Sequence, residues 1–61
     1  MPVITIDGPY LNKAQKQELV EKLTETASSI INLPEEAIIV LIREVDHDNV
    51  GVGGMLLSDR S

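Results

Sequence analysis

The segment Ile38-Ile39-Val40-Leu41-Ile42 restricts the possible folds most, because it places five apolar residues in succession. A half-exposed strand alternates apolar and polar residues, whereas an unbroken apolar run of this length is typical of a strand covered on both faces. We predict a strand over residues 38–45. The sequence has one long helical pattern, and one helix covers one face. The second face is therefore expected to lie against another subunit.

The helical pattern occupies residues 13–31. Its apolar side chains recur at the spacings that one face of a helix requires. Asn12 precedes the pattern as a good N-cap, and Gln15 follows at the spacing of a capping box. Asn32 can adopt the left-handed conformation that ends a helix, and Pro34 prevents its continuation. The expected apolar face comprises Leu19, Val20, Leu23, Ala27, Ile30 and Ile31.

A first strand is expected over Val3–Asp7, where β-branched residues dominate and Gly8-Pro9 end the segment. A strand, a helix and a second strand in this order predict a β-α-β unit with parallel strands. The glycines of Gly51-Val52-Gly53-Gly54 predict a short C-terminal hairpin, and residues 58–61 are expected to fray. We therefore predict an α+β fold that forms a single domain over residues 1–61.

The size of the chain makes an isolated monomer marginal. It has 61 residues and a mass of 6.7 kDa, for which size scaling gives a folded surface of roughly 3,900 Å². Burial of apolar surface contributes about 90 kcal/mol, and ordering the chain costs about as much. Because the sequence has no Cys, disulfides and thiolate zinc sites are excluded. Oligomerisation is the remaining route to stability, so we expect a homo-oligomer.

Charge and composition exclude several classes of partner. The net charge of −5 and the pI near 4.5 argue against nucleic acid, which selects basic surfaces. Tyr10 is the one aromatic residue, so the sequence offers no platform for stacking bases. The longest apolar run, residues 37–42, is far too short to cross a bilayer. We expect a cytoplasmic protein without a membrane partner.

Pro2 is the candidate that offers the most distinctive chemistry. It follows Met1 at the start of the first strand. After removal of Met1 its nitrogen is a secondary amine attached to a rigid element, which suits proton transfer. The alternative is that a proline follows the start codon by chance.

Three further features have two interpretations each. The glycines of residues 51–54 lack the spacing of a dinucleotide-binding loop, so a hairpin is favoured over a phosphate site. Residues 46–48 contain two aspartates and His47, but a solvated loop is favoured over a metal site or a catalytic histidine. Arg43 interrupts an apolar strand. It either binds an anionic substrate or pairs with a carboxylate at a subunit interface, and the pairing is favoured.

Five features follow one another over nearly the whole chain. They are Pro2 at the start of a strand, one long helix, an apolar second strand, Glu44-Val45-Asp46 and the glycines of residues 51–54. In this order the chain resembles small archaeal-type members of the 4-oxalocrotonate tautomerase family. The resemblance implies β-α-β protomers that form four-stranded dimers and then homohexamers, as trimers of dimers, with sites at subunit boundaries. It also implies enol–keto tautomerisation of a small 2-oxo or 2-hydroxydienoate acid, with Pro2 as general base and no metal or organic cofactor.

Three positions depart from that family's pattern. Leu11 and Ile39 stand where the best-known members carry arginines, and Val50 stands where they carry an aromatic residue. We expect these side chains to shape the pocket, with Arg43 as a further substrate-binding candidate. Backbone N–H groups, or Lys13 and Arg43 of a neighbouring subunit, are candidates for holding the substrate anion.

Two other functions remain open: a related dehalogenase or decarboxylase that uses the same proline, and a non-catalytic oligomeric binding module.

Overall fold

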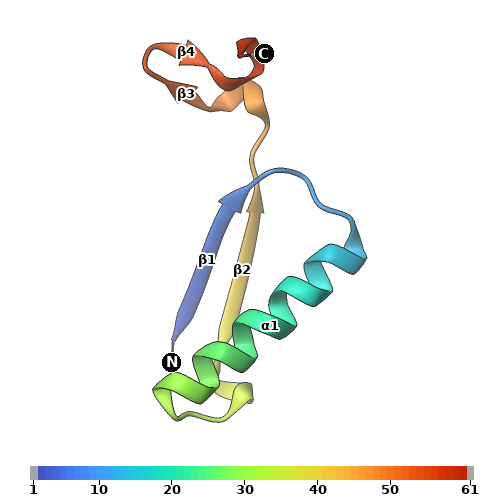
Figure 1. The fold of residues 1–61 in the computed structure, drawn as a ribbon, viewed down its shortest axis with the longest axis vertical. Helices are drawn as coiled ribbons and strands as arrows, with labels where there is room; N and C mark the ends of the chain where they lie inside the picture. Colours follow the sequence, from blue (N-terminus) through green and yellow to red (C-terminus); the bar gives the residue numbers. More distant parts are fainter. Residues whose placement is uncertain (1, 61) are drawn as a thin grey trace.

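The computed structural model describes residues 2–60. The chain passes through strand β1 (Val3–Gly8), helix α1 (Lys13–Ile31), strand β2 (Ile39–Glu44) and a hairpin of strands β3 (Gly51–Val52) and β4 (Met55–Leu56). Short 3₁₀ turns cover residues 35–37, 47–49 and 57–59. In Figure 1, α1 crosses the β1–β2 sheet and the hairpin projects beyond the carboxyl ends of both strands. The expected β-α-β unit with a C-terminal hairpin is confirmed.

The two long strands pair in parallel over their full length, as predicted. Backbone hydrogen bonds extend this ladder at both ends. The Ile39 N–H donates to the Pro2 carbonyl oxygen at 3.1 Å, and the Val45 N–H donates to the Gly8 carbonyl oxygen at 2.8 Å. The first bond fixes Pro2 to the amino end of the sheet.

The strand predicted over residues 38–45 is shorter by one residue at each end. Ile38 closes the preceding turn, because its N–H donates to the Glu35 carbonyl oxygen at 3.0 Å. With 9% of its surface exposed, Ile38 is also the buried core residue of the described chain. Strand β1 ends at Gly8, one residue beyond its predicted end at Asp7.

The predicted boundaries of α1 are confirmed by both of its caps. The Gln15 N–H donates to Asn12 Oδ1 at 2.8 Å, and the Asn12 N–H donates to Gln15 Oε1 at 3.1 Å, which forms the capping box. At the other end Asn32 has φ 68°, and its N–H donates to the Ser28 carbonyl oxygen at 2.9 Å. The helix therefore begins and ends through local contacts that the sequence specifies.

The predicted apolar face of α1 is only partly covered. Ile30 is 77% exposed and Ile31 49% exposed, because a sheet of two strands cannot cover the whole helix. The accessible surface is 4765 Å², against roughly 3,900 Å² for a compact chain of this mass. The radius of gyration is 14.8 Å, against about 10.5 Å for a compact domain of this length. The isolated chain leaves apolar surface that a compact domain would bury.

Alternation along the strands gives the sheet two different faces. The face toward α1 is partly covered. The opposite face is open, and there Val3 is 50% exposed and Leu41 49% exposed. One helix thus covers one face, as predicted, and coverage of the second face by another subunit stays a prediction. The inner face carries Ile4, Ile6, Val40 and Ile42, and the open face carries Val3, Thr5, Asp7, Ile39, Leu41 and Arg43.

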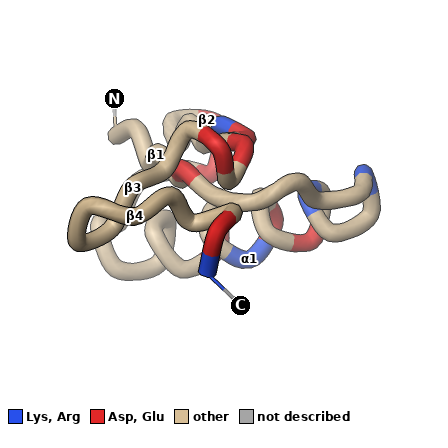
Figure 2. Tube along the Cα trace, turned by 90° about the horizontal axis from the view of Figure 1, so that it is seen from above, with Lys and Arg blue, Asp and Glu red and all other residues tan. Residues whose placement is uncertain are grey.

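The C-terminal hairpin is a tight two-residue turn. β3 and β4 pair in antiparallel fashion, and Gly53 and Gly54 between them have φ of 61° and 85°, as a type I′ turn requires. In Figure 2 this hairpin carries neither acidic nor basic colour, since residues 50–57 are uncharged. Residues 57–59 form a 3₁₀ turn instead of a frayed end, because the Arg60 N–H donates to the Leu57 carbonyl oxygen. Ser61 lies outside the described residues.

Candidate active site

Pro2 lies at the amino end of β1 and is partly buried. Its carbonyl oxygen accepts the Ile39 N–H at 3.1 Å, so the proline is held by the first rung of the parallel ladder. This bond brings together two predicted site residues, the base candidate Pro2 and the pocket candidate Ile39. The Pro2 ring is thereby attached to a rigid strand.

Leu11 and Val50 lie at the other end of the sheet. The Leu11 N–H donates to Glu44 Oε2 at 3.2 Å, at the carboxyl end of β2. Val50 precedes β3, in the segment that leaves that same end. β1 has six residues and spans about 17 Å at roughly 3.3 Å per residue. Within one chain, the predicted site is therefore divided into two halves, one at each end of β1.

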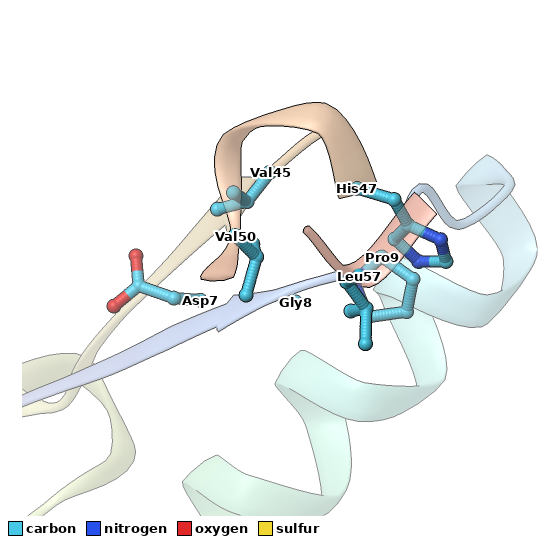
Figure 3. A pocket seen from close by; sticks show the side chains of 7 residues that line it. All are labelled: Asp7, Gly8, Pro9, Val45, His47, Val50 and Leu57. Atoms are coloured by element: carbon cyan, nitrogen blue, oxygen red, sulfur yellow. The ribbon is translucent and has the colours of Figure 1, made fainter. Parts of the chain in front are cut away.

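A cavity of about 360 Å³ occupies the second half. In Figure 3 the side chains of Val45 and Val50 lie beside each other, those of Leu57, Pro9 and His47 lie together at one side, and the Asp7 carboxylate is turned away at the other. Val50 was predicted from the sequence as a pocket residue, whereas Pro9, Val45 and Leu57 were not. No sequence signal brings these residues together, because the lining comes from the end of β1 and from the segment that follows β2, which are far apart in the sequence. The full lining is Asp7, Gly8, Pro9, Val45, His47, Val50 and Leu57.

Arg43 is paired with Asp7 on the open face of the sheet. Arg43 Nε lies 2.8 Å from Asp7 Oδ1, and Nη2 donates to Oδ2 at 3.4 Å. The expected partner was a carboxylate at a subunit interface. The partner found is a carboxylate of the same chain, because the parallel register places Asp7 beside Arg43. The guanidinium is thus paired with a carboxylate from the cavity lining.

Glu44 is a structural residue that the sequence analysis did not recognise. Its Oε2 lies 2.9 Å from Lys16 Nζ and also accepts the Leu11 N–H. The hydrogen bond from Lys16, followed by that from the Leu11 backbone, lowers the pKa of Glu44. These contacts fix the loop between β1 and α1 against the end of β2 and so set the position of Leu11.

Residues 2–60 show neither a metal-binding cluster nor a membrane-spanning helix. No group of three or more His, Cys, Asp or Glu side chains in this range is placed to hold a metal ion. In the same range no helix is long and apolar enough to cross a membrane.

The family model described as a tautomerase enzyme matches residues 2–60. The chain belongs to the tautomerase family. As a tautomerase it is an isomerase, and its likeness to 4-oxalocrotonate tautomerases, predicted from the sequence, is confirmed.

Individual relatives agree with this assignment. The 2-hydroxymuconate tautomerase of Bacillus subtilis is 44% identical over 45 residues, which cover 74% of this chain and 73% of that protein. The solved structure of DmpI from Archaeoglobus fulgidus matches with a TM-score of 0.89 at 45% identity, over 95% of this chain and 100% of its own. YwhB, a homologue of 4-oxalocrotonate tautomerase, matches with a TM-score of 0.91 at 36% identity, over 98% of this chain and 100% of its own.

Proposed function

We propose that this tautomerase is a cofactor-free enzyme that interconverts the enol and keto forms of a small 2-oxo acid or 2-hydroxydienoate, with Pro2 as its general base. The observation that carries the proposal is the attachment of Pro2 to the sheet by the Ile39 N–H. A base must hold its position relative to the substrate to transfer protons efficiently. The tautomerase family of the chain supplies the reaction class.

The chemistry requires removal of Met1. While Met1 is attached, the Pro2 nitrogen is an amide and cannot act as a base. The free nitrogen is a secondary amine, and apolar surroundings lower the pKa of an amine because they disfavour its charged form. The neutral nitrogen takes the hydroxyl proton of the enol and returns a proton to carbon, which yields the keto form. Val3 and Ile39 of the same sheet, together with Val50, are the apolar residues we assign to these surroundings.

Both halves of the site can act on one substrate only if chains assemble. Pro2 and Ile39 lie at one end of β1, and Leu11 and Val50 lie at the other. We therefore propose a homohexamer, built as a trimer of dimers, in which one chain supplies Pro2 and a neighbour supplies the cavity beside Val50. The open sheet face, with Val3 and Leu41 about half exposed, supports such an assembly.

The test is ketonisation of a 2-hydroxydienoate by protein whose loss of Met1 is verified by intact mass. We expect Pro2→Ala to lower kcat/KM by about 10²-fold or more, the usual contribution of a general base. Pro34→Ala, the same substitution in the turn before β2, is the matched control and should keep most of the activity. Equal activity of Pro2→Ala and the parent protein would reject the proposal.

A non-catalytic binding module is the second candidate. It is favoured by Leu11 and Ile39, which are apolar where well-known relatives carry arginine. The same experiment separates the two functions, because a module would show no ketonisation above the uncatalysed rate with or without Pro2. An NMR titration of Pro2 adds an independent measurement, since the enzyme requires a depressed pKa for its amine and the module does not.

A further inference from the structure

The cavity beside the hairpin is apolar at its centre. Val45, Val50 and Leu57 line it, and the ring of Pro9 closes one side (Figure 3). These side chains offer no hydrogen bond to a ligand. Its volume of about 360 Å³ is within the range of pockets for small molecules.

Two ion pairs lie near the carboxyl ends of the strands, and neither of their cations lines the cavity. The Arg43 guanidinium is held by Asp7 at 2.8 Å, and the Lys16 ammonium is held by Glu44 at 2.9 Å. His47 is the lining residue, among those described, whose side chain carries ring nitrogens that can hydrogen-bond a carboxylate. It is exposed and lies at the side of the cavity. Among the described side chains that line the cavity, one therefore offers a partner to a carboxylate, and it lies at the rim.

A second carboxylate would have to enter the apolar centre. Removal of a carboxylate from water without a hydrogen-bonding or charged partner is strongly unfavourable. A methyl or other apolar group in the same place would instead gain from contact with Val50 and Leu57. The cavity thus distinguishes ligands by the charge at the end remote from the rim.

We propose that this site selects enols of monocarboxylic acids with an apolar remote end over enols of dicarboxylic acids. The single carboxylate lies at the rim beside His47, and the apolar end lies against Val45, Val50 and Leu57. This inference rests on the proposed function and concerns the same composite site, in which a neighbouring chain brings Pro2 to the cavity.

The first test uses two substrates that differ at one end. 2-Hydroxymuconate has a remote carboxylate, and 2-hydroxyhexa-2,4-dienoate has a methyl group in its place. Each kcat/KM is divided by the uncatalysed ketonisation rate of the same enol, which removes intrinsic reactivity. With the Met1-free protein we expect the monoacid to be favoured by roughly tenfold or more, the ratio for a modest loss of binding energy. An equal or larger value for the diacid overturns the inference.

The second test releases a charge at the cavity edge. Asp7→Asn removes the carboxylate that compensates Arg43, so kcat/KM for the diacid should rise several-fold and that for the monoacid should not. Glu25→Gln is the matched control, because it makes the same change in net charge and releases Lys22 on α1, 4.0 Å from Glu25 Oε2 in the parent. An equal effect of both variants on the diacid would overturn the inference, since it would show a response to net charge alone.

A third test does not depend on turnover. Sorbate and muconate are stable dienoates with the same difference between methyl and carboxylate. In NMR titrations sorbate should shift the amides of Val50 and Leu57 at lower concentration than muconate. Tighter binding of muconate overturns the inference while leaving the proposed function intact, provided that Pro2→Ala is inactive. Full activity of Pro2→Ala overturns the proposed function and the inference with it.

Discussion

The body of the chain, residues 2–45, and its C-terminal arm, residues 46–60, are stabilised in different ways. The body has a parallel ladder, a capped helix and the buried side chain of Ile38. The arm has a two-stranded hairpin whose β3 and β4 are exposed throughout, and it projects beyond the sheet (Figure 1). Isolated two-stranded hairpins are marginally stable in water. The difference indicates that the body is held by contacts within itself, both local and across the β1–β2 ladder, whereas the arm depends on what it packs against.

The largest expected effect comes from a charge placed on the arm. Met55 is 51% exposed in a single chain, and we expect a neighbouring chain to cover it in the proposed assembly. Met55→Asp should therefore dissociate the oligomer and abolish most of the activity, because burial of an unpaired carboxylate costs several kcal/mol. Sedimentation velocity measures the assembly. Ser58→Asp introduces the same charge at a polar position of the arm, and an unchanged oligomer in Met55→Asp would refute the dependence of the arm on assembly.

A smaller effect is expected from the turn of the hairpin. Gly54 has φ +85° with open space at its Cβ position, so Gly54→Ala introduces backbone strain of about 1–2 kcal/mol without a clash. Gly51→Ala is the control, because its Cβ would meet only the Met55 carbonyl oxygen at 3.9 Å. We expect Gly54→Ala to weaken assembly in a dilution series more than Gly51→Ala does. Equal dissociation constants would contradict this.

The body should respond to loss of its helix cap. Asn12→Ala removes the acceptor of the Gln15 N–H and should lower the free energy of unfolding by about 1 kcal/mol. Asn12→Ser keeps a capping oxygen and should recover most of that loss. Urea denaturation at fixed protein concentration measures both variants. A Ser variant as unstable as the Ala variant would show that the side chain acts through something other than the cap.

The smallest effect concerns the acid range. The pKa of Glu44 is lowered in the folded chain by Lys16 and the Leu11 N–H, so its contribution to stability is present above its ordinary value of 4.5 and is lost as pH falls through the lowered one. Glu44→Gln should lower Tm near neutral pH, and the difference should shrink in acid. Glu36→Gln, in the turn before β2, is the control. A difference between Glu44→Gln and the parent that is independent of pH would exclude this role of Glu44.

Much of the body could be predicted from the sequence, because its signals are local. Asn12, Gln15 and Asn32 specify the helix ends through contacts within a few residues. The parallel pairing of the strands follows from their separation by one long helix. Gly53 and Gly54 predict the hairpin, since few other residues adopt positive φ without cost.

The candidate site was predictable only in part. Pro2 and its neighbour Ile39 come together as the parallel register requires. Two contacts were not predicted: the ion pair of Asp7 with Arg43, and the hydrogen bond from the Leu11 N–H to the Glu44 carboxylate. Both join residues more than thirty positions apart in the sequence. The strand limits were also off by one residue, since Ile38 completes a turn before the ladder begins.

The sequence by itself determined the elements of this tautomerase, their order, and the base candidate at the start of the first strand. The spacing of apolar residues, the helix-capping residues and the turn glycines each act over a few positions. The helices, strands and turns that they form can therefore be predicted without coordinates. The tertiary structure decided that Pro2 and Val50 lie at opposite ends of β1, and that an apolar cavity forms beside Val50, lined also by Pro9 and Leu57. Such placements depend on how distant segments pack in space, and no local pattern in the chain contains that information.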